Sequence, residues 1–141
     1  MALVLDTGVL YAALDAADRD HAVCAELIEA TEEQLVIPAA VLVELDYFVR
    51  KFGSADVWLA FAEDVQAGAY AIYPLDPPTL LMAARTQAKY ADLPLGLVDA
   101  SVFAVCQTLG EPKVASLDRR HFGVLRTEEG QPLEILPAID V

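Results

Sequence analysis

Two aspartates stand where the carboxyl ends of neighbouring parallel strands would place them. Asp6 directly follows the short apolar run 2–5, and Asp118 follows the run 113–116. Both runs are predicted to be buried strands. Right-handed crossovers put the ends of such strands at one edge of the sheet if the two strands are neighbours. The sequence therefore predicts that two carboxylates separated by more than a hundred residues meet at one edge.

Two further acidic residues lie on helical patterns that approach the same edge. Glu44 is about one turn into the helical pattern that follows the strand-like run 34–37. Asp99 lies in the first turns of the predicted helix 97–109, within a strongly apolar run. An aspartate buried there without a partner would be costly. We therefore expect all four carboxylates to converge on one crevice.

Four carboxylates in one crevice cannot all remain ionised unless a cation compensates their charge. Hard oxygen ligands of this kind suit Mg²⁺ or Mn²⁺. A divalent cation held there can bind a phosphate oxygen and lower the pKa of a water molecule. The set Asp6, Glu44, Asp99 and Asp118 thus favours metal-assisted hydrolysis of a phosphodiester bond, with water as the nucleophile.

Each of these residues also has a structural interpretation. Asp6 could simply cap the helix that follows it, and Asp118 could cap a turn at 119–122. Thr7 and Ser116 flank the two aspartates, and their hydroxyls could orient a water or a phosphate, or make a cap or turn hydrogen bond. These alternatives remain open at the level of the sequence.

The elements that must position the carboxylates alternate along the chain. Strands are expected at 2–5, 34–37, 70–73, 113–116 and 134–136. Helices are expected at 8–14, 21–30, 39–51, from the cap Ser54 to Gly68, 77–91 and 97–109. Short apolar strands separated by helices imply an α/β fold with a mostly parallel sheet covered by helices on both faces. Ligands of such sheets bind beyond the carboxyl ends of the strands.

Length and composition indicate one domain, residues 1–141. No apolar run approaches the roughly 18 residues of a membrane span. The start of the chain has no basic leader, so we expect a cytoplasmic protein without a membrane partner. The formal net charge of −13, with nine Lys and Arg, is unexpected for a protein that binds nucleic acid by charge alone. Contacts to nucleic acid would have to be local and helped by a bound cation, or the acidic surface would serve a basic protein partner.

The cysteines and histidines suggest no further chemistry. Cys24 and Cys106 lie on apolar helical patterns and are predicted to be buried free thiols. His21 and His121 have no Cys or His at a zinc spacing, so both are interpreted as surface or packing residues. No histidine is expected in an acid–base position beside the carboxylates.

At these residues the chain resembles the PIN-domain ribonucleases, specifically the VapC toxins of toxin–antitoxin pairs. Four segments carry the resemblance, in family order and across the whole chain: VLDTGVL at 4–10, AVLVEL at 40–45, YADLPLGLVDA at 90–100 and SLDRRHF at 116–122. Each segment alone is modest support, whereas four in order at family-like spacing are strong support.

The resemblance implies a three-layer α/β/α fold and a Mg²⁺ or Mn²⁺ site on the four carboxylates, with Asp6 and Asp99 as the usual metal ligands. It also implies endonucleolytic RNA cleavage, homodimerisation and inhibition by a cognate VapB-type antitoxin. Many members carry another acidic residue three positions before Asp99. Here that position is Gly96, so a metal contact from it is missing.

The resemblance suggests how an acidic chain could handle RNA. An antitoxin tail with Arg or Lys could enter the carboxylate pocket and compete with the metal. RNA would use local cations, with Arg119 and Arg120 as candidate substrate-positioning residues beside Arg126, and Arg50 and Lys51 further away. A solvated turn is the alternative interpretation of the Arg119–Arg120 pair.

Other functions fit parts of the pattern less well. The segment Leu5-Asp6-Thr7-Gly8 matches the aspartic-protease triplet, but that fold is β-rich and needs two such triplets. A receiver-type phosphoacceptor domain needs a lysine after a late strand, whereas Lys113 begins the predicted strand 113–116 and would point to the opposite edge. An interaction module that kept the fold should have lost carboxylates, and all four are present.

Overall fold

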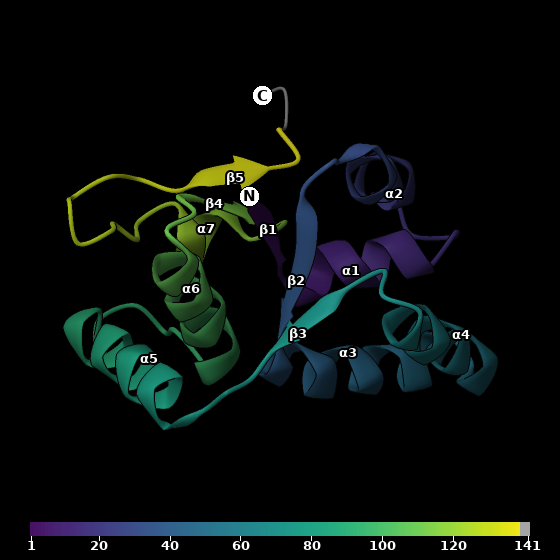
Figure 1. Ribbon diagram of the computed structural model, residues 1–141, viewed down its shortest axis with the longest axis horizontal. Helices are drawn as coiled ribbons and strands as arrows, with labels where there is room; N and C mark the ends of the chain where they lie inside the picture. The colour runs from purple at the N-terminus through teal and green to yellow at the C-terminus, as the bar shows by residue number, and fades with distance from the viewer. Residues whose placement is uncertain (139–141) are drawn as a thin grey trace.

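In the computed structural model, which describes residues 1–138, five strands and seven helices alternate along the chain (Figure 1). The strands are β1 (Ala2–Leu5), β2 (Gln34–Pro38), β3 (Ala71–Tyr73), β4 (Lys113–Ala115) and β5 (Glu134–Leu136). The helices are α1 (Thr7–Leu14), α2 (His21–Ala30), α3 (Ala39–Phe52), α4 (Ala55–Gln66), α5 (Pro77–Lys89), α6 (Leu97–Leu109) and α7 (Arg119–Phe122).

All five strands form one parallel sheet in the order β3-β2-β1-β4-β5. β1 lies at the centre, where Val4 pairs with Val36 of β2 on one side and with Val114 of β4 on the other. Every residue of β1 is buried. A strand that is covered on both faces reads as a continuous apolar run, which explains the uninterrupted sequence ALVL.

The strand order reverses its direction at β1 and β4, and this reversal locates the crevice. The chain moves outward from β1 through β2 to β3, then crosses back to β4 on the other side of β1. Figure 1 shows α1 to α4 on one side of the sheet and α5 and α6 on the other. Helices on opposite faces diverge where the winding reverses, so the crevice opens beyond the carboxyl ends of β1 and β4.

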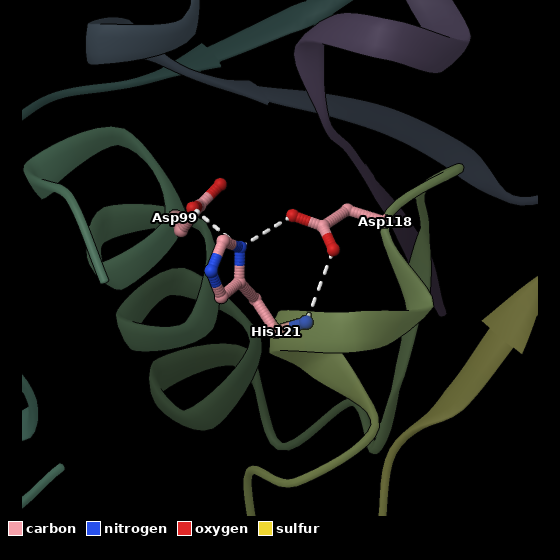
Figure 2. Close-up of side chains that lie close together, drawn as sticks. All are labelled: Asp99, Asp118 and His121. Carbon is pink, nitrogen blue, oxygen red and sulfur yellow. Dashed lines mark hydrogen bonds and ion pairs between the residues drawn. The ribbon is translucent and has the colours of Figure 1, made fainter. Parts of the chain in front are cut away.

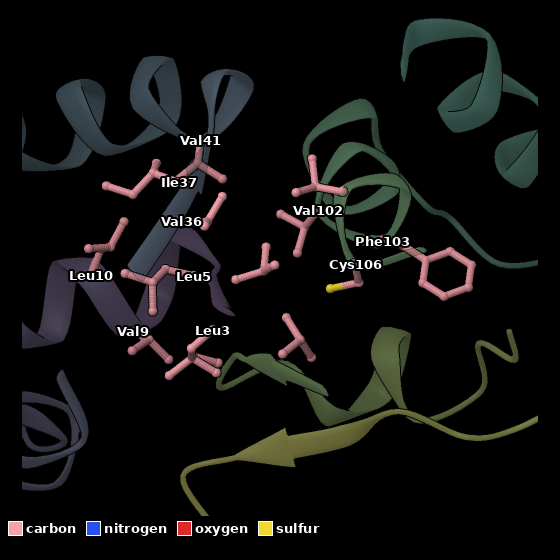
Figure 3. Close-up of a cluster of buried hydrophobic side chains, with 14 of the residues drawn as sticks. Leu3, Leu5, Val9, Leu10, Val36, Ile37, Val41, Val102, Phe103 and Cys106 are labelled. Atoms are coloured by element: carbon pink, nitrogen blue, oxygen red, sulfur yellow. The ribbon is translucent and has the colours of Figure 1, made fainter. Parts of the chain in front are cut away.

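The core lies between the sheet and the helices on either face. Figure 3 shows Leu3 and Leu5 of β1 and Ile37 of β2 packed with side chains of α1, α3 and α6. These three side chains are fully or almost fully buried. Full burial of a Leu or Ile side chain stabilises the fold by about 1.5–3 kcal/mol relative to exposure. The strand ends that carry the site are therefore anchored in a well-packed sheet centre.

Two helices owe their placement to apolar faces. Val41, Leu45 and Val49 repeat every four residues along α3 and are all buried, which leaves Glu44 on the shoulder of the helix. Every residue of α6 from 100 to 106 is buried. α6 ends at Gly110, whose φ of 67° is a left-handed conformation that glycine adopts without a steric penalty.

The predicted α/β fold with a mostly parallel sheet is confirmed, with small shifts at the ends of elements. The strand predicted at 34–37 extends to Pro38, and the strand predicted at 113–116 ends at Ala115. The helix predicted at 77–91 ends at Lys89. Both cysteines are buried and free, as predicted. Among residues 1–138, no helix has the length and apolar character needed to cross a membrane.

Candidate active site

Asp6 lies at the end of the central strand and at the start of α1. Its backbone N–H extends the β1–β4 pairing by donating to the Ala115 carbonyl oxygen at 2.9 Å. Its Oδ1 accepts a hydrogen bond from the Thr7 N–H at 2.8 Å, and the residue is 5% exposed. The cap and site interpretations of Asp6 both apply, because one carboxylate caps α1 and also lines the cleft described below.

Ser116 joins the two strand-end aspartates. Its hydroxyl donates to Asp6 Oδ2 at 2.8 Å and accepts from the Asp118 N–H at 2.9 Å. The residue is fully buried. Both hydrogen bonds are internal, so the geometry makes Ser116 a positioning residue for Asp6 and for the turn that carries Asp118.

Asp118 and Asp99 approach each other from two elements, with His121 between them. Asp118 Oδ1 accepts from the His121 N–H at 3.0 Å and thereby caps α7. Its Oδ2 lies 2.6 Å from His121 Nδ1, and Asp99 Oδ2 lies 3.5 Å from the same nitrogen. Figure 2 shows the imidazole ring between the carboxylate from α6 and the carboxylate that follows β4. One ligand atom from each of the three residues lies within 4.8 Å of the other two.

The position of His121 corrects the expectation that no histidine stands beside the carboxylates. The side chain belongs to the site and not to ordinary packing. The cause is the short helix α7, in which a residue three positions after the cap turns back toward it. A signal was present in the sequence: Asp118 and His121 are three residues apart at a predicted cap.

Glu44 completes the acidic set. It is half-buried on α3 and lines an open cleft of about 540 Å³ together with Asp6, Thr7, Gly8, Phe48, Asp99, Leu117 and Asp118. The structure thus brings all four predicted carboxylates to one cleft. Glu44 comes from α3 and Asp99 from α6, whereas Asp6 and Asp118 come from the segments that directly follow β1 and β4. This is the location that the reversal of strand order indicates.

Burial and mutual repulsion make the ionised carboxylates unfavourable in the absence of a cation. Burial raises the pKa of Asp6 from 3.8 to about 6, and the charges of Asp99 and Glu44 act in the same direction. The hydrogen bonds from Ser116 and Thr7 partly oppose this shift in pKa. The pKa of Asp99 is also raised, chiefly by burial and then by the charge of Asp118, while the nearby His121 imidazole opposes the shift.

The donor set fits a hard divalent cation. It offers carboxylate oxygens from four residues, which Mg²⁺ and Mn²⁺ prefer over nitrogen or sulfur. Among the described residues, Thr7 Oγ1 is buried without a hydrogen-bond partner at the wall of the same cleft. Buried hydroxyls are normally paired. An unpaired one beside repelling carboxylates is consistent with a site that takes an ion with its water molecules.

The two candidate positioning arginines are not equivalent. One guanidinium nitrogen of Arg119 donates to the carbonyl oxygens of Ile135 and Pro137, at 3.2 and 2.6 Å. Arg119 therefore ties α7 to β5. Arg120 is exposed and makes no side-chain hydrogen bond within residues 1–138. Of the pair, Arg120 has the side chain that is available to a ligand.

Two competing functions disagree with the structure. Lys113 lies at the start of β4 and forms an ion pair with Glu33, at the opposite edge of the sheet from the cleft. It cannot serve as the lysine of a receiver-type phosphoacceptor site. The aspartic-protease interpretation needed a β-rich fold, whereas the five strands described here form a parallel sheet covered by helices.

Comparisons with known proteins find a matching family and a related protein. Residues 3–126 match the PIN domain family. The chain is 33% identical to ribonuclease VapC26 of Mycobacterium tuberculosis over 135 residues, which cover 96% of this chain and 100% of the relative.

Solved structures show the same fold at lower identity. The crystal structure of VapC20 of Mycobacterium tuberculosis, a sarcin–ricin loop cleaving toxin, has a TM-score of 0.74 at 19% identity, with 84% of this chain and 91% of that chain covered. DNA-bound VapBC from Salmonella typhimurium has a TM-score of 0.72 at 19% identity, with 96% and 98% covered.

Proposed function

We propose, because this chain belongs to the PIN-domain family, that it is a metal-dependent endoribonuclease of the VapC type. The observation that carries this proposal is the convergence of Asp6, Glu44, Asp99 and Asp118 on one cleft at the ends of β1 and β4. The raised pKa values of Asp6 and Asp99, caused chiefly by burial and then by neighbouring carboxylates, suit a site for a divalent cation and a phosphate.

Asp6 and Asp99 are the proposed ligands of a Mg²⁺ or Mn²⁺ ion, with Glu44 and Asp118 completing the acidic wall. When bound, the ion neutralises charge on the scissile phosphate and lowers the pKa of the attacking water. Because the four carboxylates act jointly, the site is defined without assigning the role of general base to any one of them.

The neighbouring side chains hold this arrangement in place. Ser116 fixes one oxygen of Asp6 and the backbone of Asp118, and His121 fixes one oxygen of Asp118. Positioning of this kind matters because misplacement of a reacting group by about 1 Å can cost on the order of a hundredfold in rate. The Thr7 hydroxyl is the proposed contact for a water molecule or a phosphate oxygen, and Arg120 is a proposed contact for RNA.

The test of this function is cleavage of total RNA by the purified protein with and without a divalent cation. We expect cleavage in Mg²⁺ or Mn²⁺, and a fall on the order of a hundredfold or more in EDTA, because charge neutralisation worth several kcal/mol is lost. Restoring either ion should restore the rate, and the comparison of the two ions shows which is preferred.

An Asp6→Asn preparation, purified identically, controls for a contaminating ribonuclease. Cleavage that persists in EDTA, or that is equal in the Asp6→Asn preparation, would refute the metal-dependent mechanism. RNA left intact by the wild-type protein under all metal conditions would refute the ribonuclease function itself.

We also propose that the chain is the toxin of a toxin–antitoxin pair, acts as a homodimer and is neutralised by a VapB-type antitoxin. The cleft carboxylates and the net charge of −13 favour a basic antitoxin segment that enters the cleft and competes with the metal. Purified antitoxin should then inhibit RNA cleavage, and excess Mg²⁺ should relieve that inhibition. Inhibition that is independent of Mg²⁺ concentration would rule out the competition.

A further inference from the structure

A second hollow lies on the far side of α6 from the sheet. It has a volume of about 380 Å³ and runs between α5, α6 and the segment after α7. In Figure 3 the Phe103 ring lies on the side of α6 that faces away from the labelled residues of the sheet. We call this hollow the α5–α6 groove and define it by Leu81, Arg85, Lys89, Tyr90, Phe103 and Arg126. One carboxylate, that of the exposed Glu128, also lines it.

The groove gathers three cations without an ion pair, whereas within residues 1–138 the other six Lys and Arg residues comprise three that are ion-paired and three, Lys51, Arg119 and Arg120, that are not. Three of the nine Lys and Arg residues line it: Arg85, Lys89 and Arg126. Elsewhere Arg19, Arg50 and Lys113 form ion pairs with Asp20, Asp46 and Glu33. Within residues 1–138, none of the three groove cations has a carboxylate partner. A cluster of unpaired positive charge on a protein of net charge −13 indicates an anionic ligand.

Two of the three cations have defined neighbours in the groove, and one of them, Lys89, has its Nζ 5.5 Å from the centroid of the Tyr90 ring. Arg85 and Lys89 are four residues apart and therefore on the same face of α5. Arg126 is fixed from the other wall, because its backbone N–H donates to the Tyr90 hydroxyl at 3.2 Å and its guanidinium donates to the carbonyl oxygens of Gly123 and Leu125, both at 2.9 Å. The wall formed by α5 and the wall formed by Arg126 thus both carry positive charge, and Phe103 of α6 lies between them.

α6 connects the groove to the cleft. Asp99, Phe103 and Gln107 recur every four residues along this helix, the first in the cleft and the other two in the groove. At 1.5 Å per residue, the groove begins about 6 Å along the helix from Asp99 and extends about another 6 Å. A polyanionic chain bound at the cleft is therefore within reach of the groove.

The charge of the groove is local. An adjoining hollow of about 400 Å³ shares Met82, Gln107 and Glu128 with it, but is also lined by Glu111 and Glu129. A polyanion would be repelled from that acidic neighbour. Phosphates can therefore lie only at the end of the groove that is beside Arg85, Lys89 and Arg126.

We propose that the α5–α6 groove binds a single-stranded segment of the RNA substrate outside the cleaved bond, an inference that rests on the proposed ribonuclease function. Arg85, Lys89 and Arg126 contact phosphates, and Tyr90 and Leu81 offer surfaces on which bases lie. Single-stranded RNA suits such a surface because its bases are free to stack and its backbone carries the charge. The groove lengthens the binding site beyond the four carboxylates.

The test is binding of a fluorescent single-stranded RNA of about 12 nucleotides, measured by anisotropy in EDTA so that the RNA stays intact. Arg85→Gln with Lys89→Gln should weaken binding roughly five- to tenfold, as expected for two exposed charge pairs. The slope of log Kd against log salt should fall by about 1.4, because each lost phosphate contact accounts for about 0.7. The single variants Arg85→Gln and Lys89→Gln are each compared with Arg19→Gln. This control removes one charge from a side chain outside the groove that is 92% exposed.

Melting temperatures of all variants check that the fold is intact. An unchanged affinity and salt slope in the double variant would overturn the groove, even if the wild-type protein cleaves RNA. A loss of self-association in sedimentation, with RNA affinity retained, would also overturn it and assign the groove to contact between copies. RNA binding that depends on the groove, in a protein that does not cleave RNA, would support the groove and reject the ribonuclease function.

Discussion

Asp99→Asn should lower the rate of metal-dependent RNA cleavage by about a thousandfold or more. Asp99 is a proposed metal ligand, and its carboxylate lies within 4.8 Å of the nearest ligand atoms of Asp118 and His121. The change removes one negative charge with almost no change of shape. Loss of one preorganised charge-stabilising group costs on the order of a hundred- to a thousandfold, and loss of a ligand also lowers occupancy of the site. The measurement is the initial rate on a labelled RNA at saturating Mg²⁺.

Asp92→Asn is the matched control, because it makes the same chemical change at an exposed turn seven residues earlier. Its rate should equal that of the wild type. Asp99→Asn should not destabilise the metal-free protein, since burial and the charge of Asp118 already disfavour the ionised form of Asp99. RNA cleavage at the wild-type rate by Asp99→Asn would show that Asp99 is not part of the active site.

The free energy of unfolding of the metal-free protein should fall as the pH rises from about 4 to about 6, because of the Asp6 carboxyl. The pKa of Asp6 is about 6 in the folded protein, against 3.8 as its ordinary value. In this range the folded protein keeps a proton that the unfolded chain has released, so the free energy of unfolding falls with rising pH. A shift of this size corresponds to about 3 kcal/mol.

Asp6→Asn should remove this component and stabilise the metal-free protein at pH 7.5 by about 1–3 kcal/mol. Urea unfolding in EDTA at pH 5 and pH 7.5 measures both effects, and the difference between wild type and variant isolates Asp6 from other acids. Mg²⁺ should stabilise the wild type more than the variant, because a ligand that binds the folded state adds to its stability. Equal pH dependence in the two proteins would contradict the assignment.

The carboxylate site could be predicted from the sequence because it follows from topology. Asp6 and Asp118 each stand after an apolar strand, and parallel strands wound in opposite directions from a centre leave their carboxyl ends at one crevice. Glu44 and Asp99 were placed by the same logic on the helices that start near that edge. These inferences needed neither side-chain packing nor exact element boundaries.

The sequence was a poorer guide where a side chain depends on contacts between distant segments. His121 was misassigned because its position relies on α7 packing against α6. Arg119 was grouped with Arg120 as a candidate RNA contact, and the structure adds that its guanidinium bonds to the carbonyl oxygens of Ile135 in β5 and of Pro137. Arg126 was grouped with the same pair, whereas the structure places it in the α5–α6 groove. For Arg119, contacts with the C-terminal strand decide the direction of the side chain, and local spacing does not encode them.

The hydrogen bond between Asp6 and Ser116 spans 110 residues and bears on when this enzyme becomes active during its own synthesis. Asp6 is synthesised well before its supporting serine, the turn with Asp118 and the flanking strand β4. A nascent chain that lacks β4 has an unpaired edge on β1 and only three of the four carboxylates. The complete four-carboxylate site can therefore assemble only after residues 113–118 have been synthesised.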